Sequence, residues 1–380
     1  MKILFLGNPS SVFVKELMVR LKKKRSDFDL TLIPLTTKQG LEEEYYKRKN
    51  INVVYVSRSF PEVFYKIPKI RGALFLFDIR IFLRKNKFDI CNLHFASWFM
   101  GLVANSLRKC CSKLVISVWG SDFYRTNDRW KQMIQSQLFK NASVVTTTNP
   151  ETMMQINCRF NIRPKVRKEI IRFGLAPLEE MSVIKGKTKT FYKKKLNIPS
   201  DHILITCGYH GGEIHQHLKI IESFYFVKNQ MPRKIFLYFP MTYGLTHSYG
   251  TKVKRELENL GFPYWIQKSF MSDEEVARLR FATDIFINVP VSDQLSGSMQ
   301  EHLFAGSIVI TGEWLPYKPL YDQGIKALRV ATVRDVGLKS LDAIRTLEKK
   351  EPLPDFSQII WDYSSWEANI SKWVEFYEKL

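Results

Sequence analysis

Short apolar runs bounded by turn-forming residues alternate with segments of helical period along the first half of the chain. The first run covers residues 2–6, and after a turn at 7–11 the apolar residues recur with the spacing of one helix face. This alternation is the βαβ pattern of a parallel sheet covered by helices. It predicts further strands at 30–34, 53–56, 90–94, 114–118 and 144–147.

The pattern is lost in a basic stretch at 163–195, where 172–175 would close a first domain and 185–195 would form an exposed linker and helix. It then restarts, and the helix expected at 363–380 is amphipathic. We therefore predict an α/β fold of two Rossmann-like domains, 1–180 and 181–362, with the helix 363–380 packing back on the first domain. The strands expected in the second domain are 203–208, 235–239, 264–267, 285–289 and 308–311.

Composition narrows the class of protein. The 380 residues are too many for one ordinary core, and the 45% apolar content excludes a mostly disordered chain. No apolar run approaches the roughly 18 residues of a membrane-spanning helix. The five cysteines are odd in number and contain no C-x-x-C pair, which favours a reducing, cytoplasmic setting and argues against a zinc site.

The net charge of +21 is unevenly distributed. Residues 1–180 hold 32 Lys+Arg and 15 Asp+Glu, or +17, and the remaining 26 and 22 give +4. The excess indicates a polyanionic partner for the first half, either nucleic acid or an anionic membrane surface; the alternative is a generally basic proteome. Eight Lys or Arg residues interleave with aromatic residues at 58–88, a pattern that suits a membrane interface or a buried face with a charged rim.

The segment 290–306 carries the strongest candidate chemistry. Ser296, Gly297 and Ser298 can begin a helix whose N–H groups and dipole suit a diphosphate. Glu301 could accept the two hydroxyls of a ribose, and Asp293, in the preceding loop, could meet sugar hydroxyls. The alternative is an ordinary helix with Ser298 and Glu301 as its capping box.

This segment resembles the donor signature of the family 4 glycosyltransferases of GT-B fold, in which seven residues separate two acidic ones. Asp293, in place of the usual Glu, and Glu301 match it, followed by Ala305-Gly306. Three more features fall in family order: a strand ending in His94, the turn Trp119-Gly-Ser-Asp122, and the segment 272–284. The resemblance implies a GT-B fold, a donor site in the second domain, an acceptor site in the first, and retention at the anomeric carbon.

The family places Arg and Lys near the start of the second domain to hold the donor diphosphate. In this chain His210 and His215 occupy those positions, after a strand that ends at Gly208. Histidine can donate to phosphate, and Lys268, after another expected strand, could add a permanent charge. The alternative is that these histidines belong to a solvated loop.

In the first domain, Gly7, Asn8 and Ser10 lie where the acceptor-side loop of a GT-B enzyme approaches the donor. The loop is neither G-x-G-x-x-G nor a P-loop, which disfavours nicotinamide and nucleoside-triphosphate chemistry. His94 and Asp122 follow expected strands. We predict catalytic roles for Asp122, His94 and Asp293, with Asp122 activating the acceptor hydroxyl or, alternatively, only capping its turn.

A second resemblance, to the lipid-linked fucosaminyltransferase of enterobacterial common antigen synthesis, rests on 119–124, 208–212 and 239–243. Together the two predict a metal-independent hexosyltransferase, without a cofactor, at the inner face of the membrane. It would move a sugar from a nucleotide diphosphate to a glycan or lipid-linked glycan in bacterial surface polysaccharide synthesis, and would not bind nucleic acid. The alternatives are a GT-B-like sugar-nucleotide epimerase and a basic nucleic-acid-binding protein.

Overall fold

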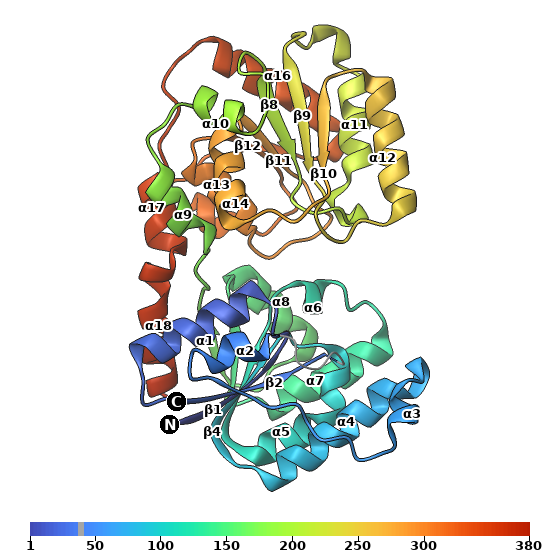
Figure 1. Cartoon of the computed structure of the whole chain (residues 1–380), viewed down its shortest axis with the longest axis vertical. Helices are drawn as coiled ribbons and strands as arrows, with labels where there is room; N and C mark the ends of the chain where they lie inside the picture. Colours follow the sequence, from blue (N-terminus) through green and yellow to red (C-terminus); the bar gives the residue numbers. More distant parts are fainter. Residues whose placement is uncertain (37–41) are drawn as a thin grey trace. The chain divides into compact units, whose positions relative to one another are not determined.

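The computed structural model describes residues 1–36 and 42–380. The chain divides into two compact units, Met1–Gly174 with Trp366–Leu380, and Leu175–Ser365. Each unit holds one parallel sheet with helices on both faces (Figure 1). The predicted fold class, α/β with two Rossmann-like domains, is therefore confirmed.

The first domain has a seven-stranded sheet in the order β3-β2-β1-β4-β5-β6-β7. Its strands are β1 (Lys2–Gly7), β2 (Asp29–Pro34), β3 (Asn52–Val53), β4 (Phe88–His94), β5 (Cys111–Ser117), β6 (Val144–Thr147) and β7 (Arg167–Ile170). Its helices are α1 (Val12–Lys24), α2 (Glu43–Lys47), α3 (Glu62–Tyr65), α4 (Pro68–Lys85), η1 (Trp98–Val103), α5 (Ala104–Cys110), α6 (Ser121–Tyr124), α7 (Arg129–Asn141), α8 (Pro150–Phe160) and α18 (Trp366–Glu378).

The second domain has a six-stranded sheet in the order β10-β9-β8-β11-β12-β13. Its strands are β8 (Ile203–Cys207), β9 (Ile235–Pro240), β10 (Tyr264–Gln267), β11 (Ile285–Asn288), β12 (Ile308–Gly312) and β13 (Leu328–Val330). Its helices are α9 (Pro177–Ile184), α10 (Lys189–Lys195), η2 (Glu213–His215), α11 (His217–Tyr225), η3 (Lys228–Gln230), α12 (His247–Leu260), α13 (Asp273–Ala282), α14 (Gly297–Phe304), α15 (Lys318–Tyr321), η4 (Val333–Asp335), α16 (Val336–Glu348) and α17 (Ser357–Ser364).

Each sheet buries side chains on both faces, because successive residues of a strand point to opposite sides. In β1, Leu4 and Leu6 enter one core, whereas Ile3 and Phe5 enter the core on the other face. In β8 of the second domain, Ile205 and Leu204 likewise enter different cores. The near-continuous apolar runs of the sequence are thus explained by sheets that are covered on both sides.

The end of the chain differs from the single helix expected at 363–380. The helix is interrupted at Ser365, so that α17 lies in the second domain and only α18 in the first. Within the first domain α18 buries Trp366, Trp373 and Tyr377, whose hydroxyl accepts a hydrogen bond from Asn92 Nδ2 at 2.6 Å. The chain therefore leaves the first domain after Gly174 and returns to it at Trp366, instead of at the expected 180 and 363.

Two further expectations change. The strands β7 and β13 were not predicted, since β7 (Arg-Lys-Glu-Ile) is largely exposed at a sheet edge and β13 has only three residues. The segment 185–195, expected as an exposed linker and helix, does contain the helix α10, but Lys193 of this helix is buried and pairs with Asp284 at 2.5 Å. Among residues 1–36 and 42–380, none of the helices has both the length and the apolar character needed to cross a bilayer.

Candidate functional site

The candidate donor residues of the second domain gather at one point of its sheet. Strands β8 and β11 are parallel neighbours, and the chain extends the sheet from β8 toward β10 and from β11 toward β13. The order of strands therefore reverses between β8 and β11. Open α/β sheets bind ligands beyond the carboxyl ends of strands at such a reversal. The predicted residues Gly208, His210 and His215 follow β8, and Asp293 to Glu301 follow β11.

Hydrogen bonds tie these two loops together. The Gly208 N–H donates to the Ile287 carbonyl at 2.9 Å, and the Val291 N–H donates to the Ile214 carbonyl at 2.9 Å. The Gln216 Nε2 donates to the Val289 carbonyl at 2.7 Å. The two candidate segments, about 80 residues apart in sequence, thus form one structural unit.

Gly208 allows the first loop to turn. Its φ is +68°, a left-handed conformation that other residues adopt only with strain. A Cβ at this position would lie 3.0 Å from His217 Nε2 and 3.2 Å from His215 Nδ1. The glycine therefore sets both the turn and the space into which the histidine rings pack.

The histidines differ in their surroundings. His210 is half-buried, and its Nδ1 accepts the Gly212 N–H at 2.9 Å, which places the ring proton on Nε2. His215 is buried edge-on against His210, with ring centroids 4.0 Å apart. His217 is also buried, and burial lowers its pKa to about 3. His210 is therefore the most accessible of the three. The alternative of a solvated loop is wrong, because His215 and His217 are buried.

The helix α14 begins at Gly297, with Ser296 as its N-cap: the Ser296 Oγ accepts the Met299 N–H at 3.1 Å. The expected alternative, a capping box of Ser298 and Glu301, is wrong because the cap lies two residues earlier. This leaves the Ser298 hydroxyl buried, without a hydrogen-bond partner among the described residues. A buried hydroxyl in the first turn of a helix is a ready donor for an anion.

Glu301 is buried in an ion pair that the sequence did not predict. Its Oε2 accepts a hydrogen bond from Arg280 Nε, on α13, at 2.9 Å, and both side chains are almost completely buried. The Glu301 Oε1 lies 3.9 Å from the position that a Cβ of Gly297 would take. One carboxylate oxygen is thus held by Arg280, and the other lies beside the first turn of α14.

Asp293 is held by two phenols. Its Oδ2 accepts hydrogen bonds from the Tyr317 hydroxyl at 2.9 Å and from the Tyr209 hydroxyl at 3.3 Å, and its Oδ1 accepts the Gln294 N–H at 2.7 Å. Tyr317 is buried, and Asn288 Nδ2 donates to its oxygen at 2.9 Å. Burial raises the pKa of Tyr317, so the phenol stays protonated and donates to Asp293. The carboxylate therefore has a fixed position next to the β8 loop.

Lys268 does not join this group. It is exposed and follows β10, the edge strand, whereas the other residues follow β8 and β11. Because neighbouring strands lie about 4.8 Å apart, the end of β10 is roughly 10 Å from the end of β8. The position of Lys268 therefore does not support its predicted role in donor binding.

The candidate residues of the first domain lie at the corresponding reversal, between β1 and β4. Gly7 ends β1, and a Cβ there would lie 3.4 Å from His94 Cβ at the end of β4. Asn8 and Ser10 follow in an exposed turn, in which Asn8 Oδ1 accepts the Ser10 N–H at 3.1 Å. Both polar side chains of this loop face solvent.

His94 is enclosed, whereas the sequence placed it at a substrate-facing strand end. It is completely buried, stacks on Phe5 with centroids 5.5 Å apart, and contacts the rings of Trp119, Phe173 and Trp373. Neither ring nitrogen has a hydrogen-bond partner among the described residues. Burial lowers the pKa of His94 to about 3, so the imidazole is neutral at physiological pH.

Asp122 is buried as well, and its carboxylate accepts the Ala96 N–H at 2.6 Å and the Trp119 N–H at 3.0 Å. Burial raises its pKa to about 6, although the hydrogen bonds from backbone N–H groups oppose this rise. These contacts match the alternative in which Asp122 caps its turn. They also fix the strained loop at Phe95, whose φ is +70°.

Comparison with known proteins bears on the fold and the class of the protein. Residues 2–149 match the family model described as Glycosyl transferase 4-like. None of the curated protein sequences matches the chain.

Solved glycosyltransferase structures match the fold over the whole length. HepE of Anabaena, in complex with UDP and glucose, has a TM-score of 0.76 at 12% identity, with 100% of each chain covered. A glycosyltransferase of Rickettsia africae has a TM-score of 0.73 at 14% identity, covering 100% of this chain and 98% of that one. The sucrose-phosphate synthase of Thermosynechococcus elongatus has a TM-score of 0.71 at 15% identity, with the same coverage. The predicted GT-B fold and glycosyltransferase class are confirmed.

Proposed function

We propose that this chain transfers a sugar from a uridine diphosphate donor to a glycan or lipid-linked glycan acceptor in bacterial surface polysaccharide synthesis. The observation that carries the proposal is the group at the carboxyl ends of β8 and β11. There the start of α14, the Ser298 hydroxyl, His210 and Glu301 lie on two loops joined by hydrogen bonds. HepE, which shares the fold, was solved with UDP and with UDP-glucose.

The donor diphosphate is proposed to lie at the N-terminus of α14. The free N–H groups of the first turn, the helix dipole and the Ser298 hydroxyl all favour an anion there. The His210 Nε2–H adds a donor from the β8 loop. These groups stabilise the negative charge that develops on the departing diphosphate, which is where such groups accelerate transfer most. The proposed reaction needs no cofactor.

Glu301 is proposed to bind the ribose. Arg280 holds Oε2, which fixes the orientation of the carboxylate and directs Oε1 toward the start of α14. Asp293, oriented by Tyr209 and Tyr317, is proposed to contact hydroxyls of the transferred sugar. In the first domain Asp122 and His94 are proposed to shape the acceptor loop. Asp122, whose pKa is about 6, is proposed to take the proton of the acceptor hydroxyl.

The acceptor is proposed to be lipid-linked because of an apolar surface on the first domain. Between residues 60 and 77 six large apolar side chains are exposed, among lysines and arginines; we call them the apolar patch: Phe60, Val63, Phe64, Ile67, Ile70 and Phe77. These residues lie on or next to α3 and the first half of α4, and the ring centroids of Phe60 and Phe77 are 5.3 Å apart. They belong to the domain of greater positive charge. Exposed apolar residues within a basic surface suit the headgroup region of an anionic bilayer. We therefore propose that the protein binds peripherally to the inner face of the membrane.

Calorimetry with UDP, GDP, ADP and TDP tests the donor proposal. We expect UDP to bind most tightly, and Ser298→Ala to weaken its binding roughly 10-fold or more, because a hydrogen bond to a charged group contributes about 1.5–3 kcal/mol. Among the residues that the structure describes this hydroxyl has no hydrogen-bond partner, so we expect its removal to leave the stability of the fold unchanged. Ser182→Ala, on an exposed turn of α9, is the control. Equal UDP affinity in the two variants would contradict the site.

The same preparation separates the alternatives. Sugar transfer to a membrane extract that contains lipid-linked glycans supports the proposal. Donor turnover without any acceptor identifies an epimerase or hydrolase instead. Nucleic-acid binding that falls steeply with salt, together with no affinity for any nucleotide diphosphate, identifies the non-enzymatic alternative.

A further inference from the structure

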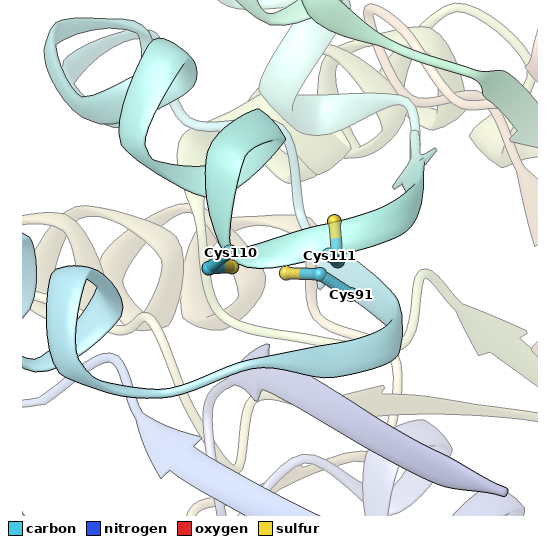
Figure 2. A group of neighbouring side chains, drawn as sticks. All are labelled: Cys91, Cys110 and Cys111. Atoms are coloured by element: carbon cyan, nitrogen blue, oxygen red, sulfur yellow. The ribbon is translucent and has the colours of Figure 1, made fainter.

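Three cysteine thiols meet in the first domain, away from the candidate site (Figure 2). Cys91 lies within β4, Cys110 ends α5, and Cys111 begins β5. Their sulfur atoms all lie within 4.8 Å of one another, and all three residues are buried. Cys158 is exposed and Cys207 belongs to the second domain, so neither takes part.

The fold brings these thiols together in a fixed arrangement. Helix α5 passes directly into β5 without a loop, and the thiols of Cys110 and Cys111 both donate to the Leu107 carbonyl, at 3.1 and 3.2 Å. Cys91 faces this junction from the neighbouring strand β4, and Figure 2 shows its sulfur turned toward that of Cys110. Cysteine is a common core residue, but three thiols at one point also form a ligand set.

We propose that Cys91, Cys110 and Cys111 bind one monovalent soft metal ion, with Cu(I) as its representative. The ligand set contains sulfur alone, because in the described part of the chain neither His, Asp nor Glu joins the group. Hard cations such as Mg²⁺ and Ca²⁺ take oxygen ligands, and structural Zn²⁺ takes four ligands. Soft thiolates select Cu(I), and three sulfur atoms complete the coordination of this ion without a fourth ligand.

The charge of such a site balances. All three sulfur atoms coordinate Cu(I), two as thiolates and one as a neutral thiol, so binding releases two protons and leaves the group with one negative charge. One permanent cation lies next to the group: Arg108, whose Nη1 donates to the carbonyls of Cys111 and Ser112 at 3.0 and 3.4 Å. The site and its counter-ion are therefore neutral together, which a buried position demands.

Anaerobic titration tests this site independently of glycosyl transfer. The reduced protein is incubated with Cu(I) held by bicinchoninate, and loss of the coloured complex gives stoichiometry and affinity. We expect one Cu(I) per chain for the wild type and for the control Cys158→Ala. The variants Cys91→Ala and Cys111→Ala should each bind at least about 100-fold more weakly. Circular dichroism verifies that each variant is folded, and Cys111→Ala suffices where Cys91→Ala does not fold.

X-ray absorption of the copper-loaded protein should find sulfur ligands alone. Undiminished copper binding by Cys111→Ala would overturn the assignment, as would its loss in Cys158→Ala. Preferential uptake of Zn²⁺ from a mixture of both ions would also overturn it, because it requires a fourth ligand that this group lacks.

Discussion

The two domains use the same topological position in different ways. In the second domain the polar groups at the strand reversal remain available: the Ser298 hydroxyl has no partner among the described residues, and Glu301 Oε1 lies beside the start of α14. In the first domain the corresponding groups already have neighbours in the fold, because His94 is enclosed by aromatic rings and Asp122 accepts backbone N–H groups. The proposed donor site therefore has polar groups to offer a ligand, whereas the strand reversal of the first domain offers few.

The largest expected effect is at Glu301. Glu301→Ala leaves Arg280 as a buried charge without its partner, which typically destabilises a protein by about 3–5 kcal/mol. The ion pair means that this substitution removes a proposed ribose ligand and also destabilises the fold. Denaturant unfolding should show the loss of stability, and calorimetry should show that UDP no longer binds.

A double variant separates the two roles of Glu301. Arg280→Met with Glu301→Met replaces the pair by apolar side chains, which is often neutral or stabilising. We expect near wild-type stability and still no UDP binding. Wild-type affinity in this double variant would show that Glu301 has only a structural role.

Gly208→Ala is expected to have the next largest effect. It adds left-handed strain of about 1–3 kcal/mol and a methyl group 3.0 Å from the His217 ring. Gly324→Ala, at φ +85° with no atom within 4 Å of the added Cβ, is the matched control because it adds the strain alone. Only Gly208→Ala should weaken UDP binding. An equal loss of stability and unchanged UDP binding in both variants would mean that the β8 loop does not depend on close packing of its histidines.

The stability of the first domain should depend on pH, because it contains a buried histidine. His94, with a pKa of about 3 when folded and about 6.5 when unfolded, binds protons mainly in the unfolded state. Stability from this group is therefore lost as pH falls below about 6.5, by roughly 2 kcal/mol at pH 5. His94→Phe should raise stability at pH 5 by about that amount and change it little at pH 7.

Asp122 contributes a pH dependence of stability that is opposite in sign to that of His94. Its folded pKa of about 6 lies above the unfolded value of about 4, so the folded state binds more protons and stability falls as pH rises from 4 to 6. Wild type contains both slopes, which oppose each other, and burial of His217 and His302 lowers their pKa values and adds further slopes of the His94 kind. The Asp122 slope is therefore the difference between the profiles of His94→Phe and of His94→Phe with Asp122→Asn. Urea unfolding at pH 4, 5, 6 and 7 measures both profiles, and two parallel profiles would exclude a raised pKa for Asp122.

Sequence reasoning succeeded where one short segment determines the structure. The alternation of apolar runs predicted eleven of the strands, and the residues from Asp293 to Glu301 do lie at the reversal in the second sheet. It missed β7 because Arg167 to Ile170 form an exposed edge with little apolar pattern. It missed the Arg280–Glu301 pair and the thiol group because each joins residues of different elements, and spacing alone does not predict which helix and strand will meet.

The smallest expected effect on stability belongs to the apolar patch, although its effect on localisation is large. Val63 and Phe64 are 61% and 43% exposed, so Val63→Ser with Phe64→Ser should change the free energy of unfolding by less than about 0.5 kcal/mol. Co-sedimentation with vesicles rich in phosphatidylglycerol should nevertheless fall several-fold, because apolar burial and charge attraction act together at a bilayer. Phe226→Ser, a 71% exposed residue of the less basic second domain, is the matched control and should leave vesicle binding unchanged. An equal loss of vesicle binding in both variants would show that exposed apolar residues contribute wherever they lie. Unchanged vesicle binding in both would show that the apolar patch does not enter the bilayer, and that only the charge of the first domain attracts it to the vesicles.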